Sequence, residues 1–360
     1  MTRKRVDTHN VSGFLKKKKY FIAFIASCFY IAGIFYDIPA IAAWMGFCFA
    51  AYSVVANDSI QTLGTFIASN RNVHWWIMWG FISSVFLLTA GYSWYIHSGD
   101  VTFQRLSARG LDRTPTIFAY LQVTAPLFLL ILTRLKIPVS TTFLILTCFT
   151  TSTTTVGAIL LKSLLGYVIA FSIALVLWFA VSKVIKKSKK KNFHRGWRVT
   201  QWISTGSLWA IWLMQDASNV AVFLPRSLTG WEFTGFASVI IVGLGLLFFK
   251  QGEKIQEIVE EKSRIQDTRS ATIVDFIYAG ILYLFKIQNN IPMSTTWVFI
   301  GLLAGREIAK SLTGTNEKRE LRGAIQMAVR DFSYVTIGLL VSMIIAVFGN
   351  ETIRLEWLGF

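Results

Sequence analysis

The sequence predicts an all-α polytopic membrane protein with roughly 9–12 membrane segments. Two homologous repeats are expected, inverted and carrying re-entrant helical hairpins. Three observations predict this fold. Of 360 residues, 54% are hydrophobic and 15% are charged, whereas about a quarter of the residues are charged in an average soluble protein. Long runs with almost no charge recur along the chain, and a pair of polar motifs occurs twice.

The apolar runs are long enough to form membrane helices. A helix needs roughly 17–25 residues to cross a bilayer, and inside lipid only helices and closed barrels satisfy every backbone polar group. Barrel strands alternate in polarity at every second residue. These runs are apolar throughout and therefore predict helices. They are Tyr20–Tyr36, Ile38–Ala56, Val73–Ile96, Ile117–Thr133, Leu164–Val181, Phe233–Phe249, Ile273–Phe285 and Phe332–Phe348.

Basic residues predict the orientation. The chain carries a net charge of +17, with one basic cluster before the first run and another at Lys183–Arg198. Basic residues beside membrane helices tend to stay in the cytoplasm, so both clusters are placed there in a multi-pass cell-membrane protein. Their lysines favour anionic lipid, and no nucleic acid, as a partner. The predicted parts are a basic N-terminus with an extra helix (1–37), a first repeat (38–182), a basic linker (183–198) and a second repeat (199–360).

A two-part polar pattern occurs once in each half. The first half contains Asn57-Asp58-Ser59-Ile60-Gln61 and Pro138-Val139-Ser140-Thr141-Thr142; the second contains Gln215-Asp216-Ala217-Ser218-Asn219 and Pro292-Met293-Ser294-Thr295-Thr296. The proline follows the aspartate by 80 positions in the first half and 76 in the second. Duplicated halves are typical of secondary transporters, whose sites lie where the halves meet. The segment list does not itself distinguish inverted from parallel halves.

The Pro-x-Ser-Thr-Thr motifs have the composition of an anion site. Proline is favoured in the first turn of a helix, and the free N–H groups that follow it bind anions at the positive end of the helix dipole. Hydroxyl groups add further donors for a tetrahedral oxyanion. The predicted substrate-binding residues are Ser140, Thr141, Thr142, Ser294, Thr295 and Thr296, together with Asp58 and Asp216. The alternative interpretation is an ordinary helix cap.

The two aspartates are the residues of the pattern that cost the most free energy to place within a membrane. A charge at depth in a membrane costs at least about 2.5 kcal/mol, so such residues usually have a function. Ionised, each can bind Na⁺; protonated, each can donate to the anion and carry a coupling H⁺. The predicted cation-binding residues are Asn57, Asp58, Gln61, Gln215, Asp216 and Asn219. The alternative is an aspartate that caps a helix end in water.

Nothing in the sequence predicts an enzyme, a resident metal or a cofactor other than Na⁺ as the coupling ion. The histidines lack metal-ligand spacing, and the sequence shows no nucleotide loop or nucleophile–base pair. Cys28, Cys48 and Cys148 lie in apolar runs and are expected to be buried and reduced. Arg226 and Arg306 follow the second-half motifs and are expected to anchor helices at the membrane boundary.

The motifs resemble the duplicated Gly-Ala-Asn-Asp-x-x-Asn and Pro-Val-Ser-Thr-Thr-His signatures of the inorganic phosphate transporter (PiT) family. The resemblance runs from about Ile38 to Lys310. Gln61 and Gln215 replace asparagines of the first signature, and Phe143 and Trp297 replace the histidines of the second. The resemblance implies inverted halves and symport of inorganic phosphate with Na⁺ or H⁺ by alternating access.

The expected function is phosphate import by cation symport. An inside-negative potential of about 100 mV contributes roughly 2.3 kcal/mol per charge, which favours uptake of a net positive complex. Two alternatives remain at this point: a permease for sulfate or another oxyanion, and a membrane scaffold or anion sensor that does not transport. Oligomerisation, for example as a homo-oligomer, is left open.

Overall fold

Helices form the regular secondary structure of the described residues. The computed structural model describes residues 8–150, 153–188, 196–250, 268–288, 293–314 and 321–359. No strand occurs in those ranges, which confirms the all-α prediction. The elements are α1 (Thr8–Phe35), α2 (Pro39–Thr62), α3 (Gly64–Ser69), α4 (Trp75–Ile96), η1 (Ser107–Arg109), α5 (Tyr120–Arg134), α6 (Thr141–Leu144), η2 (Leu146–Phe149), α7 (Thr153–Ser188), α8 (Gly196–Ala221), α9 (Gly230–Phe249), α11 (Thr268–Ile281), the π-helical η3 (Leu282–Gln288), α12 (Thr295–Leu312), α13 (Leu321–Gly349) and α14 (Glu351–Leu358).

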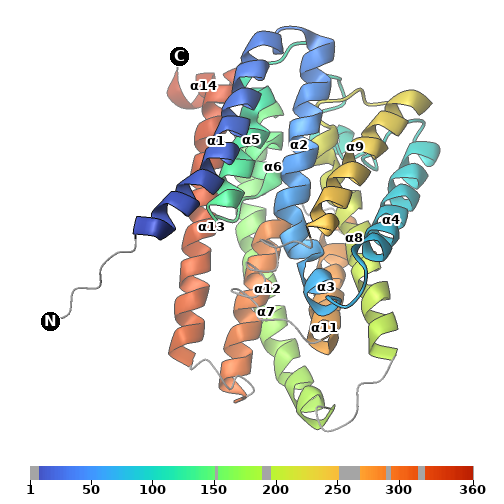
Figure 1. Ribbon diagram of the computed structural model, residues 1–360, viewed down its shortest axis with the longest axis vertical. Coiled ribbons are helices and arrows are strands. Elements are labelled where there is room, and N and C mark those ends of the chain that lie inside the picture. The colour runs from blue at the N-terminus through green and yellow to red at the C-terminus, as the bar shows by residue number, and fades with distance from the viewer. Residues whose placement is uncertain are drawn as a thin grey trace, which may run out of the picture.

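Most helices lie along the long axis of the molecule. In Figure 1, α2 runs downward from its turn with α1, whereas α8 runs upward from the lower end. The long α13 rises on the left to α14 at the upper end. Helices α2 and α8 pack against each other near the centre. Their polar motifs therefore approach one another from helices of opposite direction.

Five described helices are long and apolar enough to cross a membrane by length and composition: α2, α4, the Val156–Val181 part of α7, α9 and α13. The segments Lys19–Phe35 and Tyr120–Arg134 are shorter apolar helices. Large apolar side chains on the outer faces are exposed, such as Leu88 and Val242, as expected where lipid replaces water. The predicted total of roughly 9–12 segments also counts hairpin arms and stays a prediction.

Two interrupted hairpins enter the bundle from opposite ends. In the first, α5 descends and turns at Lys136, which adopts a left-handed φ of 63°; α6 and η2 then return upward. Asn350, at the start of α14, donates to the carbonyls of Thr147 and Thr150 at 3.1 and 2.7 Å, which fixes this return at the upper end. In the second, α11 and η3 rise from the lower end and α12 returns there (Figure 1).

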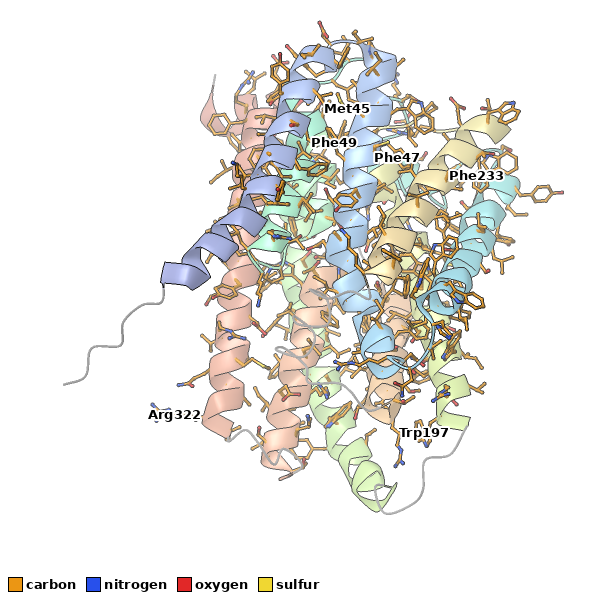
Figure 2. The ribbon with its side chains drawn as sticks, in the orientation of Figure 1. Met45, Phe47, Phe49, Trp197, Phe233 and Arg322 are labelled. Atoms are coloured by element: carbon orange, nitrogen blue, oxygen red, sulfur yellow. The ribbon has the colours of Figure 1, made fainter. Side chains whose placement is uncertain are left out.

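Different contacts hold the two ends of the bundle. Figure 2 shows Phe47 and Phe233 between helices of the upper part. The Phe47 ring stacks on Phe236 of α9 at 5.4 Å between centroids. Lower down, α12 packs closely on α7 through two glycines, since a Cβ on Gly301 or Gly305 would overlap the backbone of α7. Small residues of this spacing let membrane helices approach closely.

The expectation for Cys48 is wrong, and several predictions lie outside the described residues. Cys28 and Cys148 are buried, but Cys48 is exposed on the side of α2, because an apolar run in a membrane protein faces lipid as well as the core. Some sequence predictions fall on residues that the structure does not describe. These are the N-terminal basic residues before Thr8, residues 189–195 of the basic linker, residues 251–267 and Pro292.

Candidate functional site

The last turns of α2 carry the first polar cluster. Asn57, Asp58 and Gln61 are all buried, with Asp58 only 1% exposed. Because residues three apart share one helix face, Gln61 reaches back and donates its Nε2 to Asp58 Oδ1 at 2.9 Å. Asn57 Nδ2 donates to the same oxygen at 2.5 Å. The Asp58 carboxylate is therefore held by two amides within the protein, which contradicts a cap exposed to water.

The tip of the first hairpin lies against this cluster. Asn57 Nδ2 also donates to the carbonyl of Val139 at 3.1 Å, and Thr133 Oγ1 donates to Asn57 Oδ1 at 3.0 Å. Thr141 Oγ1 donates to Asp58 Oδ2 at 3.3 Å. The two parts of the first-half pattern, which are far apart in sequence, thus form one set of contacts.

The second-half aspartate motif joins the same set from α8. Asn219 Nδ2 lies 3.3 Å from Asp216 Oδ1. It also donates to Thr141 Oγ1 at 2.9 Å and lies 3.3 Å from Thr142 Oγ1. A chain of polar contacts therefore runs from Asp58 through Thr141 and Asn219 to Asp216. Gln215 is 1% exposed, and its Nε2 has no hydrogen-bond partner within the described part of the chain.

The start of α12 completes the network. Thr296 Oγ1 donates to the Val139 carbonyl at 3.2 Å and accepts from Gln61 Nε2 at 3.4 Å. Tyr278 of α11 donates its hydroxyl to the Thr295 carbonyl at 3.0 Å. The second hairpin therefore contacts both the first hairpin and α2. All four predicted motifs meet in one buried region.

The two serines of these motifs have a local role. Ser140 Oγ accepts from the Phe143 N–H, and Ser294 Oγ accepts from the Trp297 N–H, each at 3.4 Å. Both serines are therefore helix caps, as the alternative interpretation expected. The helices differ: α6 spans four residues and α12 spans 18. Of these two helices, only α12 is long enough to have a sizeable dipole.

One cavity adjoins the network, and a second lies between the loop after α4 and residues near the second aspartate motif. A small one of about 40 Å³ is lined by Asn57, Gln61 and Thr296 from the network, together with Thr133 and Lys136. It has room for one water molecule or a small ion. A larger one of about 610 Å³ is lined by residues 103–105, 107 and 108 of the loop after α4, together with Met214 and Ile287. Met214 lies two positions before Asp216.

Sequence reasoning missed three polar residues near the site. Asp275 of α11 is 1% exposed and accepts from the hydroxyls of Thr65 and Thr205 at 2.6 and 2.5 Å. Asp275 lies inside an apolar run. The reasoning that singled out Asp58, namely that a charge within a membrane segment costs free energy, would also have identified Asp275. Tyr278 carried no such signal. Arg109, whose Nη1 donates to Ser218 Oγ at 3.2 Å, comes from a loop that only the fold brings close.

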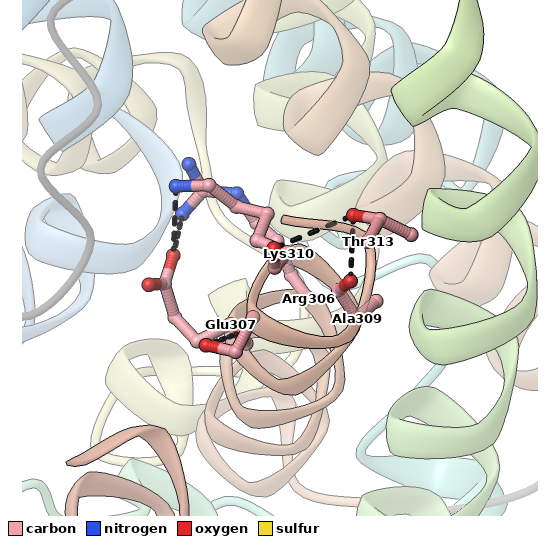
Figure 3. Close-up of polar contacts among 6 residues, drawn as sticks. Arg306, Glu307, Ala309, Lys310 and Thr313 are labelled. Atoms are coloured by element: carbon pink, nitrogen blue, oxygen red, sulfur yellow. Dashed lines mark hydrogen bonds and ion pairs between the residues drawn. The ribbon is translucent and has the colours of Figure 1, made fainter. Parts of the chain in front are cut away.

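Arg226 and Arg306 do not lie in the network, but the expectation for Arg306 is wrong. Arg306 is 2% exposed and pairs with Glu307 at 3.0 Å, as Figure 3 shows. Its guanidinium also lies 5.0 Å from the Trp178 ring centroid. It is buried against α7 because a carboxylate and an aromatic face replace its hydration. Arg226 donates to loop carbonyls, including that of Leu111 at 2.7 Å.

Comparison with known proteins identifies a related fold. No protein-family model matches the chain, and no curated protein sequence matches it significantly. A solved structure described as "The sodium-dependent phosphate transporter" is similar to it, with a TM-score of 0.60 and 18% sequence identity. The likeness covers 90% of this chain and 100% of the other. At this identity the comparison establishes a shared fold with a transport protein.

Proposed function

We propose that the chain is a secondary active transporter that imports inorganic phosphate together with Na⁺ or H⁺. The observation that carries the proposal is the buried network in which two hairpins from opposite ends meet Asp58 and Asp216. Transporters bind substrate and ions at such a meeting point of broken helices. The fold likeness to a sodium-dependent phosphate transporter supports phosphate as the substrate and favours Na⁺ as the coupling ion.

In this proposal, residues 38–182 and 199–360 are inverted repeats joined by the basic linker 183–198, with residues 1–37 as an addition. The opposite directions of α2 and α8, and of the two hairpins, support this arrangement (Figure 1). The linker ends lie at the lower end of the molecule. Because basic linkers tend to stay in the cytoplasm, the lower end is cytoplasmic and α14 faces outward.

The oxyanion binds between the hairpin tips. Thr141, Thr142 and Thr296 offer hydroxyls there, and the first N–H groups of α12, those of Thr295 and Thr296, have no acceptor inside their own helix. Ser140 and Ser294 hold the two helix starts that present these donors. The positive end of the α12 dipole adds an attraction for a negative ligand.

Cation binding and anion binding are coupled through Thr141. Its single hydroxyl proton is directed at Asp58, so the same proton cannot serve an anion while Asp58 is unneutralised. Na⁺ or H⁺ bound at Asp58, near the amide oxygens of Asn57 and Gln61, neutralises the carboxylate. The Thr141 hydroxyl can then donate to the anion instead. Asp216, Gln215 and Asn219 provide the corresponding groups in the second half.

Uptake of radiolabelled phosphate into proteoliposomes tests the proposal. Imposed Na⁺ and H⁺ gradients are compared, with sulfate as competitor and with Asp58→Asn and Asp216→Asn as variants. We expect gradient-driven accumulation of phosphate that both substitutions abolish, because each removes the charge that a coupling cation neutralises. The gradient that drives uptake identifies the cation.

Two other outcomes would contradict the proposal. Preferential accumulation of sulfate would assign the site to another oxyanion. Anion binding without flux under either gradient, in protein shown to be folded, would indicate a scaffold or sensor on this fold. A homo-oligomer is compatible with each of these functions.

A further inference from the structure

The loop of residues 97–119 is attached to the loop that follows α8. Leu228 N donates to the Gly99 carbonyl at 2.9 Å, and Ser227 Oγ donates to the Ser98 carbonyl at 2.6 Å. Arg226 Nε donates to the Leu111 carbonyl at 2.7 Å. The 97–119 loop is thus fixed over the end of α8 that carries the second aspartate motif.

The same loop has an unusual backbone directly before Arg105, which is partly buried. Phe103 and Gln104 both adopt left-handed φ values, 54° and 57°, which are unfavourable for residues with a Cβ. Asp100 holds this segment, since its carboxylate accepts from the Thr102 and Gln104 N–H groups at 2.8 and 2.5 Å. Strained backbone that its surroundings enforce is common at functional sites. Here it sets the position of Arg105.

Two arginines of this loop lie close enough to Asp216 for its charge to act on both of them, and one of the two lines the large cavity. Arg105 lines the cavity of about 610 Å³, and Arg109 Nη1 donates to Ser218 Oγ at 3.2 Å. Burial lowers the pKa of Arg109 to about 10, opposed by the Asp216 carboxylate and assisted by the nearby charge of Arg105. Both arginines therefore remain charged at neutral pH, and the two like charges repel each other.

We propose that this cavity is an outer anion site, in which Arg105 and Arg109 bind an oxyanion before it passes to the central network. The proposal rests on the proposed function, since it names the entry point of the same substrate. A phosphate fits the cavity, and guanidinium groups bind phosphate oxygens with two parallel hydrogen bonds. An anion between the arginines relieves their repulsion. Because Arg105 and Arg109 are two cations beside the single carboxylate of Asp216, they leave a net positive charge that attracts the anion.

Transport kinetics test the site with a matched control. Arg105→Gln and Arg109→Gln are expected to raise the KM for phosphate roughly tenfold each, because each loses a charge-assisted hydrogen bond, while kcat at saturating phosphate changes little. Arg105→Lys should recover part of the loss. Arg113→Gln removes the same charge from the exposed side of the same loop and should leave KM unchanged. Equal KM values for Arg105→Gln and Arg113→Gln would overturn the proposal.

A chemical assay separates this site from transport itself. In Na⁺-free buffer with choline as the counterion, inorganic phosphate should slow the modification of Arg105 by phenylglyoxal, followed by mass spectrometry, in the wild-type protein and in Asp58→Asn. Protection without uptake would support the outer site and count against the proposed transport. Uptake by the wild type without protection of Arg105 would overturn the outer site alone.

Discussion

The Thr141 hydroxyl has a central position among the polar side chains. It donates to Asp58 Oδ2 and accepts from Asn219 Nδ2 at 2.9 Å, so it connects the first-half carboxylate to the second-half amide. A valine has nearly the same shape but leaves both neighbours without this partner. Substitution of Thr141 therefore tests the proposed coupling between cation binding and anion binding without changing any formal charge.

We expect Thr141→Val to lower kcat/KM for phosphate by roughly ten- to a hundredfold, the value of one or more hydrogen bonds to charged groups. Uptake into proteoliposomes at varied phosphate measures it. Thr336→Val is the matched control: the Thr336 hydroxyl donates to the Phe332 carbonyl of its own helix at 2.9 Å, its one hydrogen bond among the residues that the structure describes. Equal kinetics for the two variants would remove Thr141 from the site.

At the scale of elements, the position of α12 depends on its glycines. Gly301 and Gly305 lie one turn apart on the face that contacts Tyr167 and Phe171 of α7. The helix can therefore approach α7 to backbone contact, which gives dense packing without a hydrophobic driving force between helices in lipid. The same packing fixes where Thr295 and Thr296 lie.

Gly305→Val should destabilise the protein by about 1–3 kcal/mol, as expected for an overpacked contact, or displace α12. Thermal unfolding in detergent measures the loss of stability. Gly157→Val is the control: it places the same side chain on α7 where nothing lies within 4 Å of the new Cβ. An unchanged melting temperature for Gly305→Val would show that α12 does not depend on close packing there.

The sequence predicted the lipid-facing helices better than the buried ones. Runs such as Val73–Ile96 coincide with helices because lipid requires apolar side chains around most of the surface. Helix α8 was absent from those runs, since it places Gln201, Thr205 and Asp216 in the protein interior. A helix surrounded by protein can carry polar groups that bond to its neighbours, so hydropathy alone does not reveal it.

At the scale of the whole molecule, the duplicated motifs predicted which residues gather but not how they are connected. Twofold recurrence selected Asp58, Asp216 and the two threonine pairs, and the fold brings these together. Nothing local predicted that the charges of Arg105 and Arg109 lie near Asp216, because their positions depend on a loop attached through tertiary hydrogen bonds. The unequal lengths of α6 and α12 also break the symmetry that the motifs imply.

The two cavities occupy complementary positions in the molecule. The small one is lined by Asn57 and Gln61 of the network and by Lys136, and the large one is lined by Met214, two positions before Asp216. In an alternating-access protein the two sides of the site open in turn, never together. Each cavity is therefore expected to lie on the path to one side of the membrane.

Thiol labelling tests this relation. Lys136→Cys and Met214→Cys are made in a background without Cys28, Cys48 and Cys148, and an impermeant thiol reagent is applied from either side. Lys136→Cys should react only from the cytoplasmic side and Met214→Cys only from the outer side. Because opening one path closes the other, adding Na⁺ and phosphate should change the two rates in opposite directions.

Glu351→Cys provides the reference rate, because Glu351 is exposed at the start of α14 and lines neither cavity. Its labelling should not respond to ligands. If both cavity positions instead reacted faster or slower together, the fold would be opening as a whole. A pore open at both ends would make each position reactive from both sides. Either result would contradict alternating access, whereas opposed changes would show that the two halves exchange exposure of one shared site.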